Sequence, residues 1–230
     1  MSMYFILIAV IAIIGLLASS NLKRKIKKYS KIFLENGITG KDVAEKMLYD
    51  NGIYDVRVTV SDGILSDNYN PNEKIIGLSK AIYSESNIFS MAVAAHETGH
   101  AIQHATAYTP LVFRSALVPV VNFSAQWVQW IIFTGLLLMG SGSNFGSSIL
   151  LTGIGLFFII TLFSFITLPV EIDASMRALN WVRRSGITSL QNYNYAEKAL
   201  RAAAYTYVIA ALSSLATLFY YVMIYTNRKN

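Results

Sequence analysis

The sequence predicts a mainly α-helical polytopic membrane protein, with about four transmembrane helices and a small α+β region containing a short two- to three-stranded sheet. Of its 230 residues, 54% are hydrophobic and 14% charged, whereas soluble proteins average about 25% charged residues. Four stretches without Asp, Glu, Lys or Arg approach or exceed the roughly 20 helical residues that span a bilayer. They cover residues 3–20, 117–140, 147–168 and 205–226.

These spans divide the chain into five segments. Residues 1–20 are predicted to be a retained transmembrane anchor rather than a cleaved signal peptide, because the basic cluster follows the apolar run instead of preceding it. An extramembrane region (21–116), a transmembrane hairpin (117–168), a second extramembrane region (169–204) and a last transmembrane helix (205–226) follow.

The charges predict the orientation of the chain. The two extramembrane regions hold 12 and 5 of the 19 Lys and Arg residues and all 13 acidic residues, leaving only Arg228 and Lys229 elsewhere. The positive-inside rule places these regions on the cytoplasmic side, with the amino terminus outside. The six basic residues between positions 23 and 31 suit an anionic lipid surface. We expect the lipid bilayer as a partner and no nucleic acid, because no separate basic domain exists.

Local patterns predict the elements of the first extramembrane region. Apolar residues at helical spacing indicate a surface helix over residues 22–33 that ends near Gly37. Thr39 and Asp42 resemble a capping box that opens a helix ending at Gly52. Alternating valines and a short apolar run predict strands at residues 56–60 and 74–79. An alanine-rich helix over residues 87–106, with Ser86 as its cap, follows.

That last helix carries all three histidines of the chain in "AHETGHAIQHA". His96 and His100 are separated by about 40° of rotation and 6 Å of rise, so both can reach one metal ion. Glu97 between them matches the H-E-x-x-H pattern, in which zinc lowers the pKa of a water and the glutamate accepts its proton. The competing interpretation is histidines that only form hydrogen bonds in a core. The absence of cysteine leaves histidine and carboxylate as the ligands of any metal site.

His104 lies one further turn along the same face, and a regular helix does not bring three successive turns to one ion. In the H-E-x-x-H-x-x-G-x-x-H pattern, a glycine breaks the helix, but that position is Gln103 here and the next histidine position is Thr106. We therefore expect His104 to lie outside the ligand set, as a supporting or surface histidine.

The third ligand is expected from "LPVEIDASMRA", at the cytoplasmic exit of the third span. The chain leaves the cytoplasmic side soon after the motif helix, crosses the membrane twice, and returns to the same side just before Glu171. Pro169 predicts a helix start there, so the competing role for Glu171 is compensation of a helix dipole. Topology favours Glu171 as the ligand.

The chain resembles the YugP-like neutral zinc metallopeptidases of bacterial membranes. The resemblance runs through "TGKDVAEKML", "LSDNYNP", "AVAAHETGHAIQHA", "LVPVVN", "LPVEIDASMRA" and "AAAYTYV", in this order. These proteins are similar to HtpX-type and CAAX prenyl proteases, which implies a zincin-like catalytic region of the gluzincin type. The resemblance implies that His96, His100 and Glu171 bind Zn²⁺ and that Glu97 is catalytic.

The resemblance also implies finer features. An edge strand before the motif helix would pair with a peptide substrate, and residues 74–79 are our prediction for it. An ordinary structural strand is the competing interpretation of these residues. Asn68 and Asn70 depart from a histidine and an aspartate in the family pattern, which puts a role for that loop in doubt. Nothing in the sequence ranks the residues that could stabilise an oxyanion, which are Tyr193, Tyr195, Tyr205 and Arg177.

The leading hypothesis is a multi-pass, zinc-dependent endopeptidase acting on membrane or membrane-proximal polypeptides at the cytoplasmic surface. The alternative is a non-catalytic scaffold or assembly factor with a structural zinc site. Such a site has four protein ligands, and His104 or Asp173 would be the fourth. A metal transporter is disfavoured because the spans lack ionisable residues. The sequence sets neither the substrate nor the oligomeric state.

Overall fold

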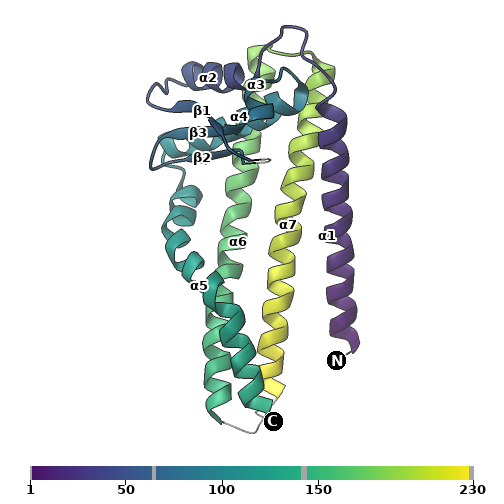
Figure 1. Ribbon diagram of the computed structural model, residues 1–230, viewed down its shortest axis with the longest axis vertical. Helices are drawn as coiled ribbons and strands as arrows, with labels where there is room; N and C mark the ends of the chain where they lie inside the picture. Colours follow the sequence, from purple (N-terminus) through teal and green to yellow (C-terminus); the bar gives the residue numbers. More distant parts are fainter. Residues whose placement is uncertain (1, 64–65, 141–143, 228–230) are drawn as a thin grey trace. The chain divides into compact units, whose positions relative to one another are not determined.

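The computed structural model describes residues 2–63, 66–140 and 144–227 as helices, strands and their connections (Figure 1). By contacts, the chain divides into two compact units. The first comprises Met1–Leu16, Phe113–Leu168 and Tyr207–Asn230, and the second comprises Leu17–Val112 and Pro169–Thr206. In chain order the elements are α1 (Ser2–Tyr29), α2 (Gly40–Asp50), β1 (Arg57–Ser61), β2 (Asn68–Asn70), β3 (Ile75–Ser79), α3 (Lys80–Ser84), α4 (Ile88–Ala105), α5 (Thr109–Gly140), α6 (Asn144–Ser185) and α7 (Leu190–Asn227).

The first unit has the character of a membrane domain. Arg114 is the one Asp, Glu, Lys or Arg in its described part. Large apolar side chains are exposed on it, such as Phe133, Phe158 and Phe219, which is typical of a surface that faces lipid. Three helices, α5, α6 and α7, are long and apolar enough to cross a membrane. The mainly α-helical membrane fold is therefore confirmed.

The prediction of about four spans exceeds by one the count in the part of the chain that the structure describes. The first predicted span, residues 3–20, forms part of α1, but the side chains of residues 2–5, 7 and 8 are outside the described residues. Residues 141–143, between the second and third predicted spans, and residues 228–230, after the fourth, also lie outside the described residues. The five-segment division of the chain stays a prediction.

Small residues and hydroxyls allow the helices of the first unit to pack closely. A Cβ atom on Gly135 would lie 2.6 Å from the backbone nitrogen of Leu150, so α5 and α6 approach there by way of the glycine. Thr161 on α6 and Ser214 on α7 share a hydrogen bond of 2.7 Å between their hydroxyls. Small-residue contacts and hydroxyl hydrogen bonds are the usual means of helix association in lipid, where burial of apolar surface provides no driving force.

The second unit contains a three-stranded sheet in the order β1-β3-β2. Strand β1 pairs with β3 in parallel, and β2 pairs with β3 in antiparallel fashion. This agrees with the expected two to three strands, but β3 is the central strand. The prediction that residues 74–79 form a substrate-pairing edge is therefore wrong, because the main chain of β3 already has partners on both sides.

Helix α4 lies in the core of the second unit. Thirteen of its 18 residues are buried, and it packs against α2, whose Val43 and Met47 are fully buried. The predicted capping box of α2 is present, with the Thr39 hydroxyl accepting from the Asp42 backbone N–H at 3.2 Å. The cap of α4 is Asn87 and not Ser86, since the Asn87 side chain accepts from the Ser90 N–H at 2.8 Å.

Two predicted helix boundaries differ from the structure. The predicted surface helix at residues 22–33 is the last part of α1, which ends at Tyr29, where this tyrosine is buried and stacks on Tyr195. Pro169 does not begin a helix but lies inside α6. Helices that cross membranes tolerate proline, because neighbouring helices and side chains can satisfy the backbone groups that it frees.

Truncation of the central strand should destabilise the second unit. Leu78 on β3 is fully buried, so Leu78→Ala is expected to lower the free energy of unfolding by about 2–5 kcal/mol. Leu190→Ala is the matched control, because Leu190 is 75% exposed and should tolerate the same change within about 0.5 kcal/mol. Unfolding of both variants in detergent, monitored by circular dichroism, checks the difference, and equal losses would contradict the assignment of the core.

Candidate metal centre

The two histidines of the H-E-x-x-H pattern lie one turn apart on α4. The ring centroids of His96 and His100 are 4.8 Å apart, and the ring planes are inclined by 80°. The helix continues through Gly99 to Ala105 without interruption, so the spacing alone places both imidazoles on one face. The His96 side chain is 15% exposed and that of His100 is 10% exposed, so the pair is nearly enclosed by protein.

Glu171 joins this pair from α6. Its Oε2 atom lies 3.3 Å from Nε2 of His96 and 3.8 Å from Nε2 of His100. The ligand atoms of the three side chains all lie within 4.8 Å of one another. The structure thus brings together the three residues that the sequence predicts as metal ligands, although Glu171 follows His100 by 71 positions.

A glycine allows the two helices to approach at this point. A Cβ atom on Gly99 would lie 2.5 Å from the backbone oxygen of Ala174 on α6. Gly99 is one residue before His100, and Ala174 is three residues after Glu171. Gly99 therefore permits the contact that sets Glu171 against the histidines.

The outer ring nitrogens of both histidines have polar partners. Nδ1 of His96 lies 3.1 Å from the Ser175 hydroxyl on α6. Nδ1 of His100 lies 3.0 Å from Oε1 of Gln103, whose Nε2 donates to the backbone oxygen of Val170 and to Asp173. With Nδ1 engaged in this way, each ring presents Nε2 toward Glu171, as metal-ligating histidines commonly do.

Glu97 is buried beside the three candidate ligands. Burial raises the pKa of its carboxyl above the ordinary value, while the neighbouring imidazoles of His96 and His100 act in the opposite direction. The negative charge of Glu171 also raises this pKa. Glu97 is therefore close enough to His96, His100 and Glu171 for their charges to shift its pKa, and the net effect favours the protonated carboxyl.

The pKa of His100 is also shifted from its ordinary value. Burial lowers it, but the neighbouring carboxylates of Glu171 and Glu97 act in the opposite direction and outweigh burial, so the pKa is raised. Negative charge thus surrounds the histidine, and the same field favours a bound cation.

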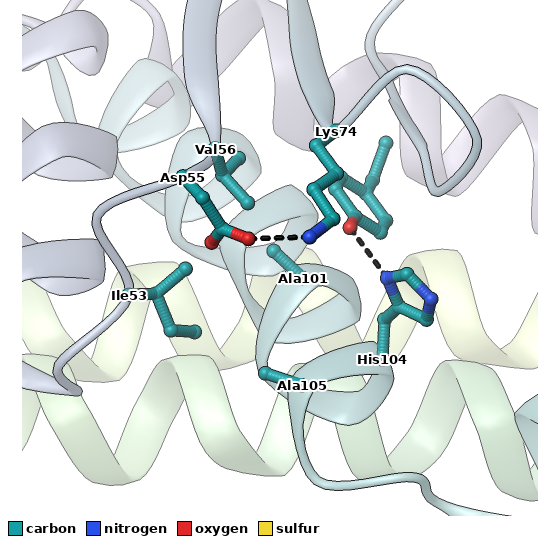
Figure 2. Close-up of a pocket in the computed structure, with 8 residues that line it drawn as sticks. Ile53, Asp55, Val56, Lys74, Ala101, His104 and Ala105 are labelled. Atoms are coloured by element: carbon teal, nitrogen blue, oxygen red, sulfur yellow. Dashed lines mark hydrogen bonds and ion pairs between the residues drawn. The ribbon is translucent and has the colours of Figure 1, made fainter.

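His104 lies apart from the ligand group. Its Nδ1 is 2.8 Å from the hydroxyl of Tyr69, which belongs to the edge strand β2. Figure 2 shows His104 at one side of a hollow of about 310 Å³ near the end of α4, with the ion pair of Asp55 and Lys74 beside it. The expectation that His104 lies outside the ligand set agrees with this position.

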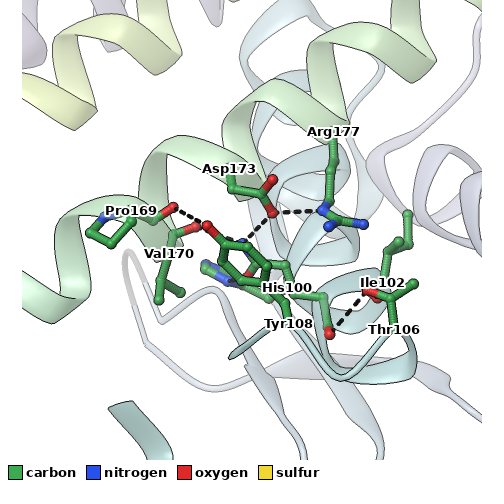
Figure 3. A network of polar contacts seen from close by, with 9 residues as sticks. His100, Ile102, Thr106, Tyr108, Pro169, Val170, Asp173 and Arg177 are labelled. Carbon is green, nitrogen blue, oxygen red and sulfur yellow. Dashed lines mark hydrogen bonds and ion pairs between the residues drawn. The ribbon is translucent and has the colours of Figure 1, made fainter. Parts of the chain in front are cut away.

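The residues that could stabilise an oxyanion lie in different surroundings. Arg177 donates to Asp173 at 2.6 Å and lies over the ring of Tyr108 (Figure 3). Tyr195 packs against Tyr29 and accepts from Gln191, and Tyr205 is 63% exposed. None of these contacts includes a candidate ligand, so the structure does not rank them.

Sequence reasoning missed the supporting residues Gln103 and Ser175. Both contacts join positions more than sixty residues apart, and neither has a local pattern. The spacing of Gln103, three residues after His100 on one helix face, was the one available signal. Asn70, at which the sequence departs from the family pattern, accepts from the backbone N–H groups of Asn72 and Glu73 and so caps a turn.

Comparison of the sequence with known proteins identifies the family of the chain. A family model described as "Putative neutral zinc metallopeptidase" matches residues 4–226. The chain belongs to this family. It is 39% identical, over 229 residues and 99% of each chain, to a protein of Bacillus subtilis (strain 168) named "Putative membrane protease YugP". No solved structure matches the chain. The chain is thus a membrane protein of a zinc metallopeptidase family.

The helix contact at Gly99 generates a prediction. Gly99→Ala would gain about 1 kcal/mol of helix propensity, but the new methyl group meets backbone on α6 and should cost about 1–3 kcal/mol. We expect a lower unfolding temperature and weaker zinc binding, because the helices must move apart at the ligand group. Gly155→Ala is the control, since no atom lies within 4 Å of its Cβ position. Thermal unfolding with and without added zinc checks this, and a Gly99→Ala variant as stable as Gly155→Ala would contradict it.

Proposed function

We propose that this protein is a zinc-dependent endopeptidase that hydrolyses peptide bonds of membrane or membrane-proximal polypeptides. The observation that carries the proposal is the group of two imidazoles and one carboxylate, with the buried Glu97 beside it. Zinc peptidases use three protein ligands of this kind and leave one coordination position open. The family assignment supports the same activity.

The distances from the Glu171 carboxylate to the two histidines are close to those expected between two ligands of one zinc ion. Two donors at the usual zinc–ligand distances in a tetrahedral site lie about 3.3 Å apart. The Nε2 atom of His96 and Oε2 of Glu171 are separated by 3.3 Å, and the corresponding distance for His100 is 3.8 Å. Imidazole nitrogen and carboxylate oxygen are ligands that zinc prefers, and the chain has no cysteine to compete with them.

In this mechanism each residue has a defined task. A zinc ion held by His96, His100 and Glu171 would supply a Lewis acid that polarises the peptide carbonyl and lowers the pKa of water. Glu97 accepts the proton of the attacking water and then passes it to the leaving amine. Burial suits Glu97 to both tasks, because a raised pKa stabilises the protonated state that lies between them.

A structural zinc site in a scaffold protein is the alternative, and it would need a fourth protein ligand. The two candidates for that ligand are engaged elsewhere in the described part of the chain. His104 shares its Nδ1 hydrogen bond with Tyr69, and Asp173 accepts from Gln103 and Arg177. Three protein donors in the group support an open position, and hence catalysis.

We further propose that the site faces the cytoplasm. The second unit carries the candidate ligands, and 17 of the 19 Lys and Arg residues lie in its range or next to it. The positive-inside rule favours the cytoplasmic side for such segments. Substrates would then be polypeptides within or close to the cytoplasmic face of the membrane.

The role of Glu97 is tested by Glu97→Gln. The amide keeps the size of the side chain but accepts no proton, so we expect zinc binding to remain and cleavage to be lost. Wild type and variant are incubated with native membranes, and new peptide amino termini are mapped by mass spectrometry. Glu73→Gln, at an exposed turn position, is the matched control that should cleave normally. New termini appearing equally with Glu97→Gln and wild type would refute the peptidase proposal.

The ligand set is tested by Glu171→Gln and His104→Gln. Loss of the carboxylate should weaken zinc binding by more than the roughly 10- to 100-fold typical when only a ligand's hydrogen-bond partner is removed. His104→Gln should bind one zinc per chain as the wild type does, because its contact is with Tyr69. Elemental analysis and chelator competition on the purified proteins provide the measurement. Loss of zinc from His104→Gln would instead favour the four-ligand structural site.

A further inference from the structure

Gln103 is a buried polar residue to which the proposed reaction gives no task. It is fully buried on α4, one turn beyond His100, and its side-chain amide lies between α4 and α6. Its Nε2 donates to the Val170 backbone oxygen at 2.7 Å and to Oδ2 of Asp173 at 2.8 Å. Its Oε1 lies 3.0 Å from Nδ1 of His100. The amide therefore uses both of its donors and one acceptor.

The partners of the amide determine which way it is turned. A backbone carbonyl and a carboxylate both accept hydrogen bonds and donate none. If the amide were reversed, its oxygen would face both acceptors at less than 3 Å. The Asp173 oxygen is held in place by Arg177, whose Nε donates to the same atom at 2.6 Å (Figure 3). The observed orientation, with the amide oxygen toward His100, is thus the one with all groups matched.

This orientation also determines the proton of His100. An amide oxygen can only accept, so Nδ1 of His100 must carry the hydrogen of the shared bond. Its lone pair for a metal ion is then on Nε2, the atom that faces Glu171. His96 differs, because the Ser175 hydroxyl at its Nδ1 can donate or accept. The surroundings of His100 therefore fix its tautomer, whereas those of His96 do not.

We infer that Gln103 is a positioning residue, which through Asp173 and Arg177 holds His100 with Nδ1 protonated and Nε2 directed at the metal. This inference rests on the proposed zinc site and adds to it a chain of three residues that sets the ligand atom. Removal of such hydrogen-bond partners of metal-ligating histidines typically weakens metal binding by about 10- to 100-fold.

The test compares zinc affinities of purified full-length variants by competition with a chromophoric chelator. Gln103→Met keeps the length and burial of the side chain but lacks the amide, and we expect about 10- to 100-fold weaker binding. Asp173→Ala removes the acceptor that orients the amide and should weaken binding to a smaller degree. Asp173→Asn retains an oxygen for both Gln103 and Arg177 and should restore most of the affinity. Gln191→Met, at an exposed position on α7, is the matched control and should bind as the wild type does.

A spectroscopic readout separates positioning from packing. The chain has three histidines, so ¹⁵N-histidine labelling gives three imidazole pairs, and His104→Gln removes one of them. In zinc-loaded wild type the Nδ1–H proton of His100 should be protected from water and give a resonance, which Gln103→Met should lose. The unfolding temperature of the zinc-free proteins is measured alongside.

The outcomes are distinct. Wild-type zinc affinity and an unchanged Nδ1–H resonance in Gln103→Met would overturn the inference, even if that variant unfolds at lower temperature, because Gln103 would then only pack. If Gln103→Met does not fold, equal affinities of Asp173→Ala and Asp173→Asn would overturn it. Failure of the wild type to bind zinc would instead refute the proposed function itself.

Discussion

The close contact of α4 and α6 at Gly99 is the constraint on which the candidate site depends. Two helices normally lie 8–10 Å apart, at a distance set by their side chains. Here α4 presents no side chain at the point of contact, because that residue is Gly99. The backbone of Ala174 occupies the space in which a Cβ atom would lie. A glycine inside a helix costs about 1 kcal/mol relative to alanine, and the chain accepts this cost at the position where the carboxylate must reach the histidines.

This contact brings together segments that are distant along the chain. Between His100 and Glu171 the chain passes through the whole of α5 and the first 27 of the 42 residues of α6, a stretch that includes Phe113–Leu168 of the first unit. That segment of the first unit carries one charged residue, Arg114, in its described part. The other Asp, Glu, Lys and Arg side chains of the described residues lie in the second unit, together with all three histidines. Helix α6 extends from one unit to the other without a break, so the register of Glu171 is set by the same helix that forms a candidate span.

The sequence predicts what depends on local periodicity and misses what depends on packing. His96 and His100 follow from a spacing of four on a helix, and Glu171 follows from topology and the scarcity of carboxylates. Pro169 led to a wrong prediction of a helix start inside α6. Proline is common in the first turn of helices in soluble proteins, but it is also tolerated within membrane helices. The central place of β3 in the sheet was not predicted, because its neighbour β2 gives no strand signal. Strand β2 has three residues, Asn-Tyr-Asn, and no alternating apolar pattern. No pattern along the chain pairs Gln103 with Val170, since only the fold brings them together.

The two histidines of the ligand group are held differently, and the difference follows from the chemistry of their partners. The Gln103 amide offers His100 only an acceptor, because both its N–H groups are directed at α6. The Ser175 hydroxyl can either donate to His96 or accept from it, so that ring keeps its tautomeric freedom. His96 is also the more exposed of the two, at 15% against 10%. The hydrogen bonds of Gln103 therefore fix the ring of His100, which is the more enclosed of the two. In the proposed peptidase, a polypeptide would approach from the more exposed side, at His96.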